Sequence, residues 1–160
     1  MKHLYLLRHA HSLDKGTGFT DRQRELSAVG FGQCIAISQF IREKKYPIEC
    51  VITSDATRAV STASLIAEQL KFSNDILQFE PSLYQASIPS MMDVLHELEH
   101  INHLLLVGHN PTLSYFAEYF TNENIGEVPP GTLLFLRSSA LGWRQMEKGK
   151  AQLIEKFIPD

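Results

Sequence analysis

Short apolar runs alternate with stretches of helical period along this chain. Continuous apolar runs are typical of strands covered on both faces, whereas apolar positions three and four residues apart predict helices with one buried face. The polar residues 10–25, which include two glycines, predict a loop. The predicted strands are residues 3–7, 50–53, 76–79, 104–107, 133–136 and 152–158, and the predicted helices are residues 27–45, 56–70, 90–101 and 112–120.

The alternation of strands and helices predicts an α/β fold. In such a fold each helix connects two parallel strands by a right-handed crossover, so the sheet is largely parallel and helices cover both of its faces. The last two predicted strands have no long helix between them, so we expect at least one antiparallel pairing at that end of the sheet. The chain has 160 residues, of which 44% are hydrophobic and 21% charged, and it contains no repeat or linker, so we expect one domain spanning residues 1–160.

The first predicted helix has a recognisable start and a candidate buried face. Ser27 is suited to the N-cap position, where a hydroxyl accepts a hydrogen bond from a free amide of the first turn. The apolar residues spaced for burial against the sheet are Phe31, Ile35, Phe40 and Ile41.

Composition and charge exclude several classes of protein. The formal net charge of −3 gives no general attraction to nucleic acid or to anionic membranes. No stretch approaches the roughly 20 apolar residues of a membrane span, and the N-terminal run is too short for a signal peptide. Cys34 and Cys50 are interpreted as core residues of a reducing compartment, with a single disulfide as the alternative. We therefore expect a cytoplasmic protein.

Arginine and histidine residues follow three of the predicted strands. Arg8 and His9 follow the first strand, Arg58 lies shortly after the second, and His109 follows residues 104–107. Because the carboxyl ends of parallel strands share one edge of the sheet, we expect these side chains to lie close together. Arg58 falls in the first turn of a predicted helix, where a cation opposes the helix dipole unless an anion lies nearby.

Two arginines and two histidines at one sheet edge suit phosphoryl transfer. Guanidinium groups bind phosphate oxygens in pairs and stay charged at all working pH values. A histidine with an ordinary pKa of about 6.5 offers a neutral ring nitrogen as nucleophile, and a second, protonated histidine stabilises charge on the phosphoryl oxygens. This chemistry requires neither a metal nor a cofactor. One Arg-His pair would be weak evidence, but three elements at three strand ends are not easily attributed to loop residues.

Four ordered motifs carry a family resemblance. They are Leu7-Arg8-His9-Ala10-x-Ser12, Asp21-x-x-Arg24-x-Leu26-x-x-x-Gly30, Ser54-x-x-x-Arg58-Ala59-x-x-Thr62-Ala63 and Gly108-His109-Asn110-Pro111. Together they resemble the histidine phosphatase superfamily, and within it the SixA-like branch of phosphohistidine phosphatases. The resemblance runs from residue 4 to about residue 138. It implies a phosphoglycerate mutase-like, three-layer α/β/α sandwich with a six-stranded, mostly parallel sheet and one antiparallel strand.

The resemblance also implies roles for the residues that match the motifs. His9 would accept the phosphoryl group, Arg8 and Arg58 would bind its oxygens, and His109 would complete the pocket. No metal or cofactor is implied.

Three further residues are candidates for binding the substrate. Ser12 and Asn110 would add hydrogen bonds or orient the pocket. Arg24 would contact phosphate or brace the loop, and a surface ion pair with Asp21 is the alternative for this residue.

The chain departs from its larger relatives at Gln85, which stands about where they place a catalytic glutamate. An amide cannot act as a general acid, so a leaving group that needs little protonic help is favoured. The expected substrate is phosphohistidine on a protein partner. A broad small-molecule phosphomonoesterase and a non-catalytic phosphate- or phosphopeptide-binding module are the alternatives. The sequence does not indicate the oligomeric state.

A rival motif lies in the third predicted helix. His96-Glu97-Leu98-Glu99-His100 matches the H-E-x-x-H pattern of zinc proteases. The apolar stripe of that helix leaves both histidines on its polar side, and no third histidine ligand follows. His11 likewise has no partner ligands at metal-binding spacing. We therefore expect no functional metal site, although His96 and His100 could bind metal incidentally. The stripe comprises Met91, Val94, Leu95, Leu98 and Ile101.

Overall fold

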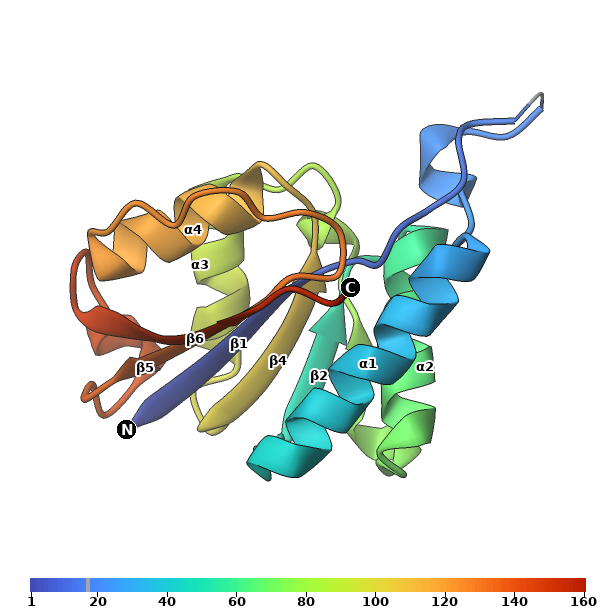
Figure 1. The fold of residues 1–160 in the computed structure, drawn as a ribbon. Helices are drawn as coiled ribbons and strands as arrows, with labels where there is room; N and C mark the ends of the chain where they lie inside the picture. Colours follow the sequence, from blue (N-terminus) through green and yellow to red (C-terminus); the bar gives the residue numbers. More distant parts are fainter. Residues whose placement is uncertain (17) are drawn as a thin grey trace.

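Six strands form one sheet in the order β3-β2-β4-β1-β5-β6 (Figure 1). The computed structural model describes residues 1–16 and 18–160; Thr17, within the predicted loop 10–25, lies outside the described residues. β5 is antiparallel to both of its neighbours, and the other strands share one direction. The expected mostly parallel sheet with one antiparallel strand is therefore confirmed. The strands are β1 (Lys2–Arg8), β2 (Cys50–Thr53), β3 (Leu77–Phe79), β4 (His103–Gly108), β5 (Leu133–Ser138) and β6 (Ala151–Phe157).

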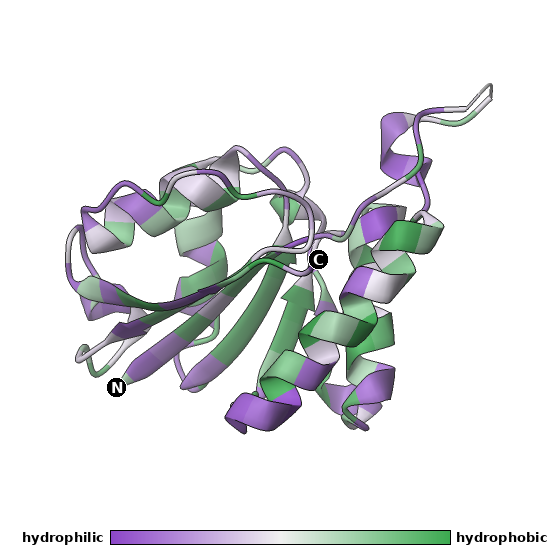
Figure 2. Cartoon of the chain, in the orientation of Figure 1, coloured by the Kyte–Doolittle hydropathy of each residue, from purple (hydrophilic) through white to green (hydrophobic). Residues whose placement is uncertain are grey.

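Helices cover both faces of this sheet and make the three-layer sandwich (Figure 1). α1 (Ala28–Lys44) and α2 (Thr57–Gln69) pack on one face, and α3 (Ile88–Glu97) and α4 (Thr112–Thr121) pack on the other. Alternate residues of each inner strand enter opposite cores, as the period of two in a strand requires. Figure 2 shows the consequence, because β2 and β4 are hydrophobic along most of their length.

The predicted buried face of α1 is partly wrong. Phe31 and Ile35 are 50% and 45% exposed, whereas Ile37 and Ile41 are buried with Cys34. Residues 28–41 contain no charged side chain, so apolar spacing alone did not distinguish the two faces of the helix. Ser27 does cap this helix, because its hydroxyl accepts a hydrogen bond from the amide of Gly30.

α3 ends earlier than the sequence predicts, at Glu97. Leu98 leaves the helical conformation, so His100 lies beyond the helix and does not share a face with His96. This removes the helical arrangement that a zinc-protease motif needs. Among the described residues, no three His, Cys, Asp or Glu side chains gather in a group that could hold a metal ion.

Two further sequence expectations concern the cysteines and the membrane. Cys34 and Cys50 are both free and buried, and burial raises the pKa of each thiol to about 11. They are core residues, and the alternative of a disulfide between them is wrong. In the described part of the chain, no helix is both long enough and apolar enough to cross a membrane.

Gly30 is required where the loop after β1 crosses the first turn of α1. A Cβ atom at this position would collide with the backbone carbonyl oxygen of His11. We expect Gly30→Ala to lower the free energy of unfolding by about 1–3 kcal/mol, the usual cost of overpacking. Gly32→Ala is the control, because nothing lies within 4 Å of its added methyl group and alanine favours helix. Thermal unfolding should show a lower Tm for Gly30→Ala and a higher Tm for Gly32→Ala than for the wild type. A higher Tm for Gly30→Ala would contradict the close contact with His11.

Candidate active site

An open pocket of about 500 Å³ lies at the carboxyl ends of β1, β2 and β4. The structure brings all seven residues nominated from the sequence to this pocket. Its edge position follows the rule for parallel sheets, in which ligands bind beyond the strand ends. The nominated residues among those that line the pocket are Arg8, His9, Ser12, Arg24, Arg58, His109 and Asn110.

His9 presents one free ring nitrogen to the pocket. Its Nδ1 lies 2.8 Å from the carbonyl oxygen of Ala10, which can only accept, so Nδ1 carries the hydrogen and Nε2 the lone pair. Arg58 Nε donates to this Nε2 over 3.3 Å. Burial lowers the pKa of His9 to about 3, opposed by its hydrogen bond to Ala10. The ring is therefore neutral, as a nitrogen nucleophile must be.

The backbone of the His9 segment is tied to the loop before β5. The amide of Gly131 donates to the carbonyl oxygens of Arg8 and His9 over 3.1 and 3.0 Å, and the amide of Arg8 donates to Thr132. On the other side, the Ala10 amide donates to Thr62 Oγ1 over 3.0 Å. These bonds fix the backbone that carries His9.

Arg8 and Asn110 are both held by the carbonyl oxygen of Val128. Arg8 Nη1 donates to it over 2.9 Å and Asn110 Nδ2 over 3.3 Å, while Asn110 Oδ1 accepts from Ser114. Among the described residues, the buried Nε of Arg8 has no hydrogen-bond partner. Burial, and then the charge of Arg58, lower the pKa of Arg8. An unpartnered buried donor beside a second guanidinium is suited to an anionic ligand.

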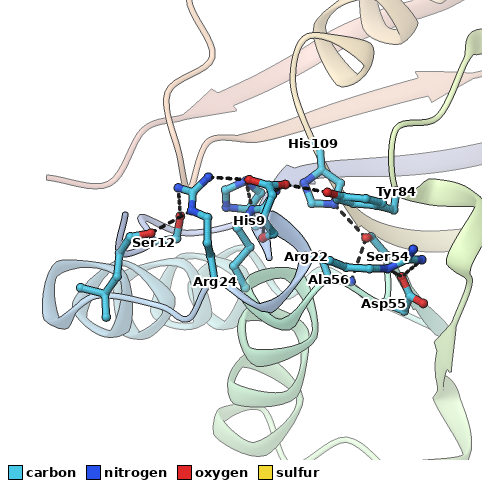
Figure 3. Close-up of polar contacts among 12 residues, drawn as sticks. His9, Ser12, Arg22, Arg24, Ser54, Asp55, Ala56, Tyr84 and His109 are labelled. Carbon is cyan, nitrogen blue, oxygen red and sulfur yellow. Dashed lines mark hydrogen bonds and ion pairs between the residues drawn. The ribbon is translucent and has the colours of Figure 1, made fainter. Parts of the chain in front are cut away.

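His109 completes the pocket from the end of β4. Its ring lies between His9 and Tyr84 (Figure 3), at centroid distances of 5.1 and 5.5 Å. Ser54 Oγ lies 2.8 Å from His109 Nε2 and accepts from the Ala56 amide, so its hydroxyl is free to donate to the ring. When Ser54 donates to Nε2, the ring hydrogen of His109 lies on Nδ1, which has no hydrogen-bond partner among the described residues. Burial, and then Arg58, lower its pKa to about 4.

Ser54 is a buried residue in contact with His109 that the sequence analysis did not nominate for the site. The N-cap of α2 is Ala56, which makes no side-chain capping bond. Ser54 instead reaches His109 (Figure 3). The position of Ser54 in the Ser54-x-x-x-Arg58 motif could have indicated that it belongs to the site.

Arg24 has both of the interactions that the sequence left as alternatives. Its Nη2 donates to Ser12 Oγ over 2.8 Å and its Nε to the Leu13 carbonyl over 2.8 Å, which braces the loop. Its Nη1 also pairs with Asp21 Oδ1 at 3.0 Å. Ser12 is therefore engaged by Arg24 rather than free in the pocket.

Asp21 and Tyr84 belong to the same network, and neither was nominated for the site. Tyr84 Oη donates to Asp21 Oδ2 over 2.6 Å, and Arg58 Nη2 donates to the same oxygen over 3.1 Å. The Arg22 guanidinium stacks on the Tyr84 ring at 4.6 Å. The hydrogen bond from Tyr84, and then that from Arg24, hold the pKa of Asp21 well below its usual range. Tyr84 directly follows a single turn of 3-10 helix, Pro81–Leu83, which is too short for a periodic pattern to indicate the direction of its side chain.

The fold and the site together define a class of protein. It is an α/β sandwich whose sheet edge holds a neutral histidine nitrogen among three arginines and a second histidine. Residues 4–83 match the sequence profile of the histidine phosphatase superfamily (branch 1), and the chain belongs to this family.

Solved structures share the fold of this chain. A protein described as the phosphohistidine phosphatase SixA of Agrobacterium tumefaciens superposes with a TM-score of 0.85 at 21% identity, covering 99% of this chain and 98% of that chain. The protein histidine phosphatase SixA in complex with tungstate gives a TM-score of 0.84 at 16% identity, covering 98% and 97%. At these identities the superpositions show a shared fold.

One sequence relative is an uncharacterized chloroplastic protein of Arabidopsis thaliana. It is 29% identical over 114 residues, which cover 71% of this chain and 50% of that protein. The chain therefore spans about half the length of this relative.

Proposed function

We propose that this protein is a metal-independent phosphohistidine phosphatase that takes the phosphoryl group onto His9. One observation carries the proposal: His9 Nε2 is unprotonated and faces Arg58 Nε at 3.3 Å, while Nδ1 is fixed on a carbonyl oxygen. A ring held in this tautomer offers its lone pair to the place where a guanidinium would bind phosphoryl oxygens.

The pocket supplies several donors for the phosphoryl group. Arg58 Nε and Arg8 Nε are hydrogen-bond donors, and His109 Nδ1 is a third donor when the ring hydrogen lies there; neither Arg8 Nε nor His109 Nδ1 has a partner among the described residues. A bound dianion would also favour protonation of His109, because a neighbouring negative charge raises a histidine pKa. These groups can stabilise the charge of the transition state, the part that metal ions play in many phosphotransferases.

The reaction has two displacements at phosphorus. First, the His9 Nε2 lone pair forms a P–N bond while the bond to the substrate nitrogen breaks. The positive charge that develops on the His9 ring is stabilised by the Ala10 carbonyl at Nδ1. Water then attacks phosphorus, the bond to His9 breaks, and dihydrogen phosphate leaves with both protons of the water. His9 returns to its starting tautomer.

The leaving group distinguishes phosphohistidine from ordinary phosphate esters. Gln85 lines the pocket about where larger members of the family place a glutamate, and no glutamate is among the described residues that line it. Of the two aspartates in the lining, Asp21 is held ionised by its hydrogen bonds and Asp14 is exposed. A phosphohistidine protonated on its second ring nitrogen leaves as neutral imidazole without further proton transfer. An alkoxide needs a general acid, which typically contributes about 10²–10⁴-fold.

The surroundings of the pocket fit a protein-bound phosphoryl group. A second hollow of about 450 Å³ adjoins the pocket and shares Arg8, Asn110 and Pro130 with it. The resulting groove leaves room for groups well beyond a phosphate.

The proposal is tested by comparing a protein phosphorylated on histidine with a phosphoserine peptide, both in excess EDTA. We expect kcat/KM for phosphohistidine to be higher by about 10² or more, because the serine alkoxide lacks an acid to protonate it. Release of inorganic phosphate gives the rate, and EDTA should not reduce it.

Three results would contradict parts of this proposal. Loss of activity on chelation would exclude the metal-independent mechanism. Faster turnover of esters would favour a small-molecule phosphomonoesterase, and phosphate binding without turnover would favour a binding module.

A further inference from the structure

Asp21 is a pocket residue that the steps above do not use. Its backbone carbonyl oxygen accepts from Arg58 Nη1 over 2.6 Å, and its Oδ2 accepts from Arg58 Nη2 over 3.1 Å. Both terminal nitrogens of the Arg58 guanidinium are thus bound by one residue. Arg58 itself is only 6% exposed, so these bonds hold a buried guanidinium group.

The geometry of a guanidinium gives this arrangement a consequence. The group is a planar fork whose donors point in fixed directions. Asp21 binds the end formed by Nη1 and Nη2, and Nε donates to His9 Nε2 over 3.3 Å. The side of the fork that contains Nε is therefore turned toward the nitrogen that would receive the phosphoryl group.

The Asp21 carboxylate is itself held in place. Tyr84 Oη donates to Oδ2 over 2.6 Å, and Arg24 Nη1 donates to Oδ1 over 3.0 Å. The hydrogen bond from Tyr84, the largest cause, keeps the pKa of Asp21 far below its usual range, so the group is ionised at working pH. An ionised carboxylate with donors on both oxygens is a rigid support for a neighbouring cation.

We propose that Asp21 is a positioning residue for phosphoryl transfer. It binds Nη1 and Nη2 of the Arg58 guanidinium and thereby orients Arg58 Nε toward the phosphoryl site on His9. The inference rests on the proposed role of His9 as phosphoryl acceptor and does not depend on which substrate delivers the group. Tyr84 supports the same alignment through its bond to the carboxylate.

The contrary arrangement would have Asp21 compete with phosphate for Arg58. A competing carboxylate would occupy the side of the guanidinium that faces His9. The distances instead place Asp21 at the opposite end, with Nε left to His9. The two arrangements predict opposite changes in anion affinity when the carboxylate is removed.

Asp14 provides a matched control for charge. It is an exposed aspartate that lines the same pocket and makes no ion pair among the described residues. Removing its charge in Asp14→Asn should leave tungstate affinity unchanged or slightly tighter, since one repulsive charge is lost. Asp21→Asn removes the same charge, yet we expect it to weaken tungstate binding about tenfold, the scale of a lost hydrogen bond to a charged group.

A double-mutant cycle tests whether Asp21 acts through Arg58. The dissociation constant for tungstate and kcat/KM for an aryl phosphate are measured for Asp21→Asn, Arg58→Ala and the double variant. We expect the tenfold loss in the wild-type background to shrink below about twofold when Arg58 is absent, because interacting residues are non-additive. Tyr84→Phe should weaken binding in the same direction as Asp21→Asn, by a smaller factor.

Two outcomes would overturn the inference. Tighter tungstate binding by Asp21→Asn would show competition, and an equal loss in the Arg58→Ala background would show a general effect on the loop. Circular dichroism and thermal unfolding confirm that each variant is folded. The tungstate measurements need no turnover, so a wild-type protein that binds tungstate but hydrolyses nothing would count against the proposed function alone.

Discussion

Replacing His9 with alanine is expected to abolish turnover and the acid-labile phosphoenzyme together. The lone pair of His9 Nε2 is the group that would bond to phosphorus, and among the described pocket residues no other nitrogen has both of these contacts. Loss of a nucleophile typically lowers kcat by about 10⁶-fold. Rapid acid-free denaturation after exposure to a ³²P-labelled substrate would show the phosphoenzyme in the wild type and none in His9→Ala.

The control for this experiment is His11→Ala. His11 lines the same pocket but is exposed, and its Nδ1 lies 2.6 Å from Ser27 Oγ. We expect this variant to keep the phosphoenzyme. Because burial lowers the pKa of His9 to about 3, the nucleophile should stay neutral, and phosphoenzyme should still form, near pH 5. A labelled intermediate in His9→Ala would show that another residue accepts the phosphoryl group.

The second large effect is expected for Arg58→Lys. Lysine keeps the positive charge, but it cannot donate to His9 Nε2 and bind two phosphoryl oxygens through a planar fork. Removing one preorganised donor to the transition state typically costs about 10²–10³ in kcat. Steady-state kinetics with an aryl phosphate should therefore show a fall in kcat of this size.

Arg42→Lys is the control for the arginine substitution. Arg42 is exposed near the end of α1 and donates to the Gln69 carbonyl, away from the pocket. We expect its kinetics to match the wild type. If Arg58→Lys kept wild-type kcat, charge alone would suffice and the fork geometry would be irrelevant.

The positions of the four central site residues were predictable because a general rule places them. Arg8 ends a buried strand, and His9 and His109 directly follow buried strands. Such strands are the easiest elements to identify from apolar runs. Parallel strands end at one edge of the sheet, so these residues had to converge there. Arg58 followed from its position in the first turn after β2.

Some features of the helices and of the site could not be predicted from the sequence, each for a physical reason. The exposed face of α1 was misassigned because Phe31 and Ile35 are as apolar as the buried residues beside them. The end of α3 was misplaced because the apolar period continues through Leu98 and Ile101 after the backbone has left the helix. Tyr84 enters the site from an irregular segment, where side-chain direction follows from tertiary contacts and not from a period.

The bonds between the His9 segment and residues 131–132 bear on when the pocket can exist during synthesis. The amide of Gly131 donates to the carbonyl oxygens of Arg8 and His9, and β5 forms one flank of β1. His9 thus precedes by more than a hundred residues the segment that supports its backbone. A nascent chain that has reached His9 still lacks residues 131–132, so we expect the backbone at His9 to be held in place only after those residues have been synthesised.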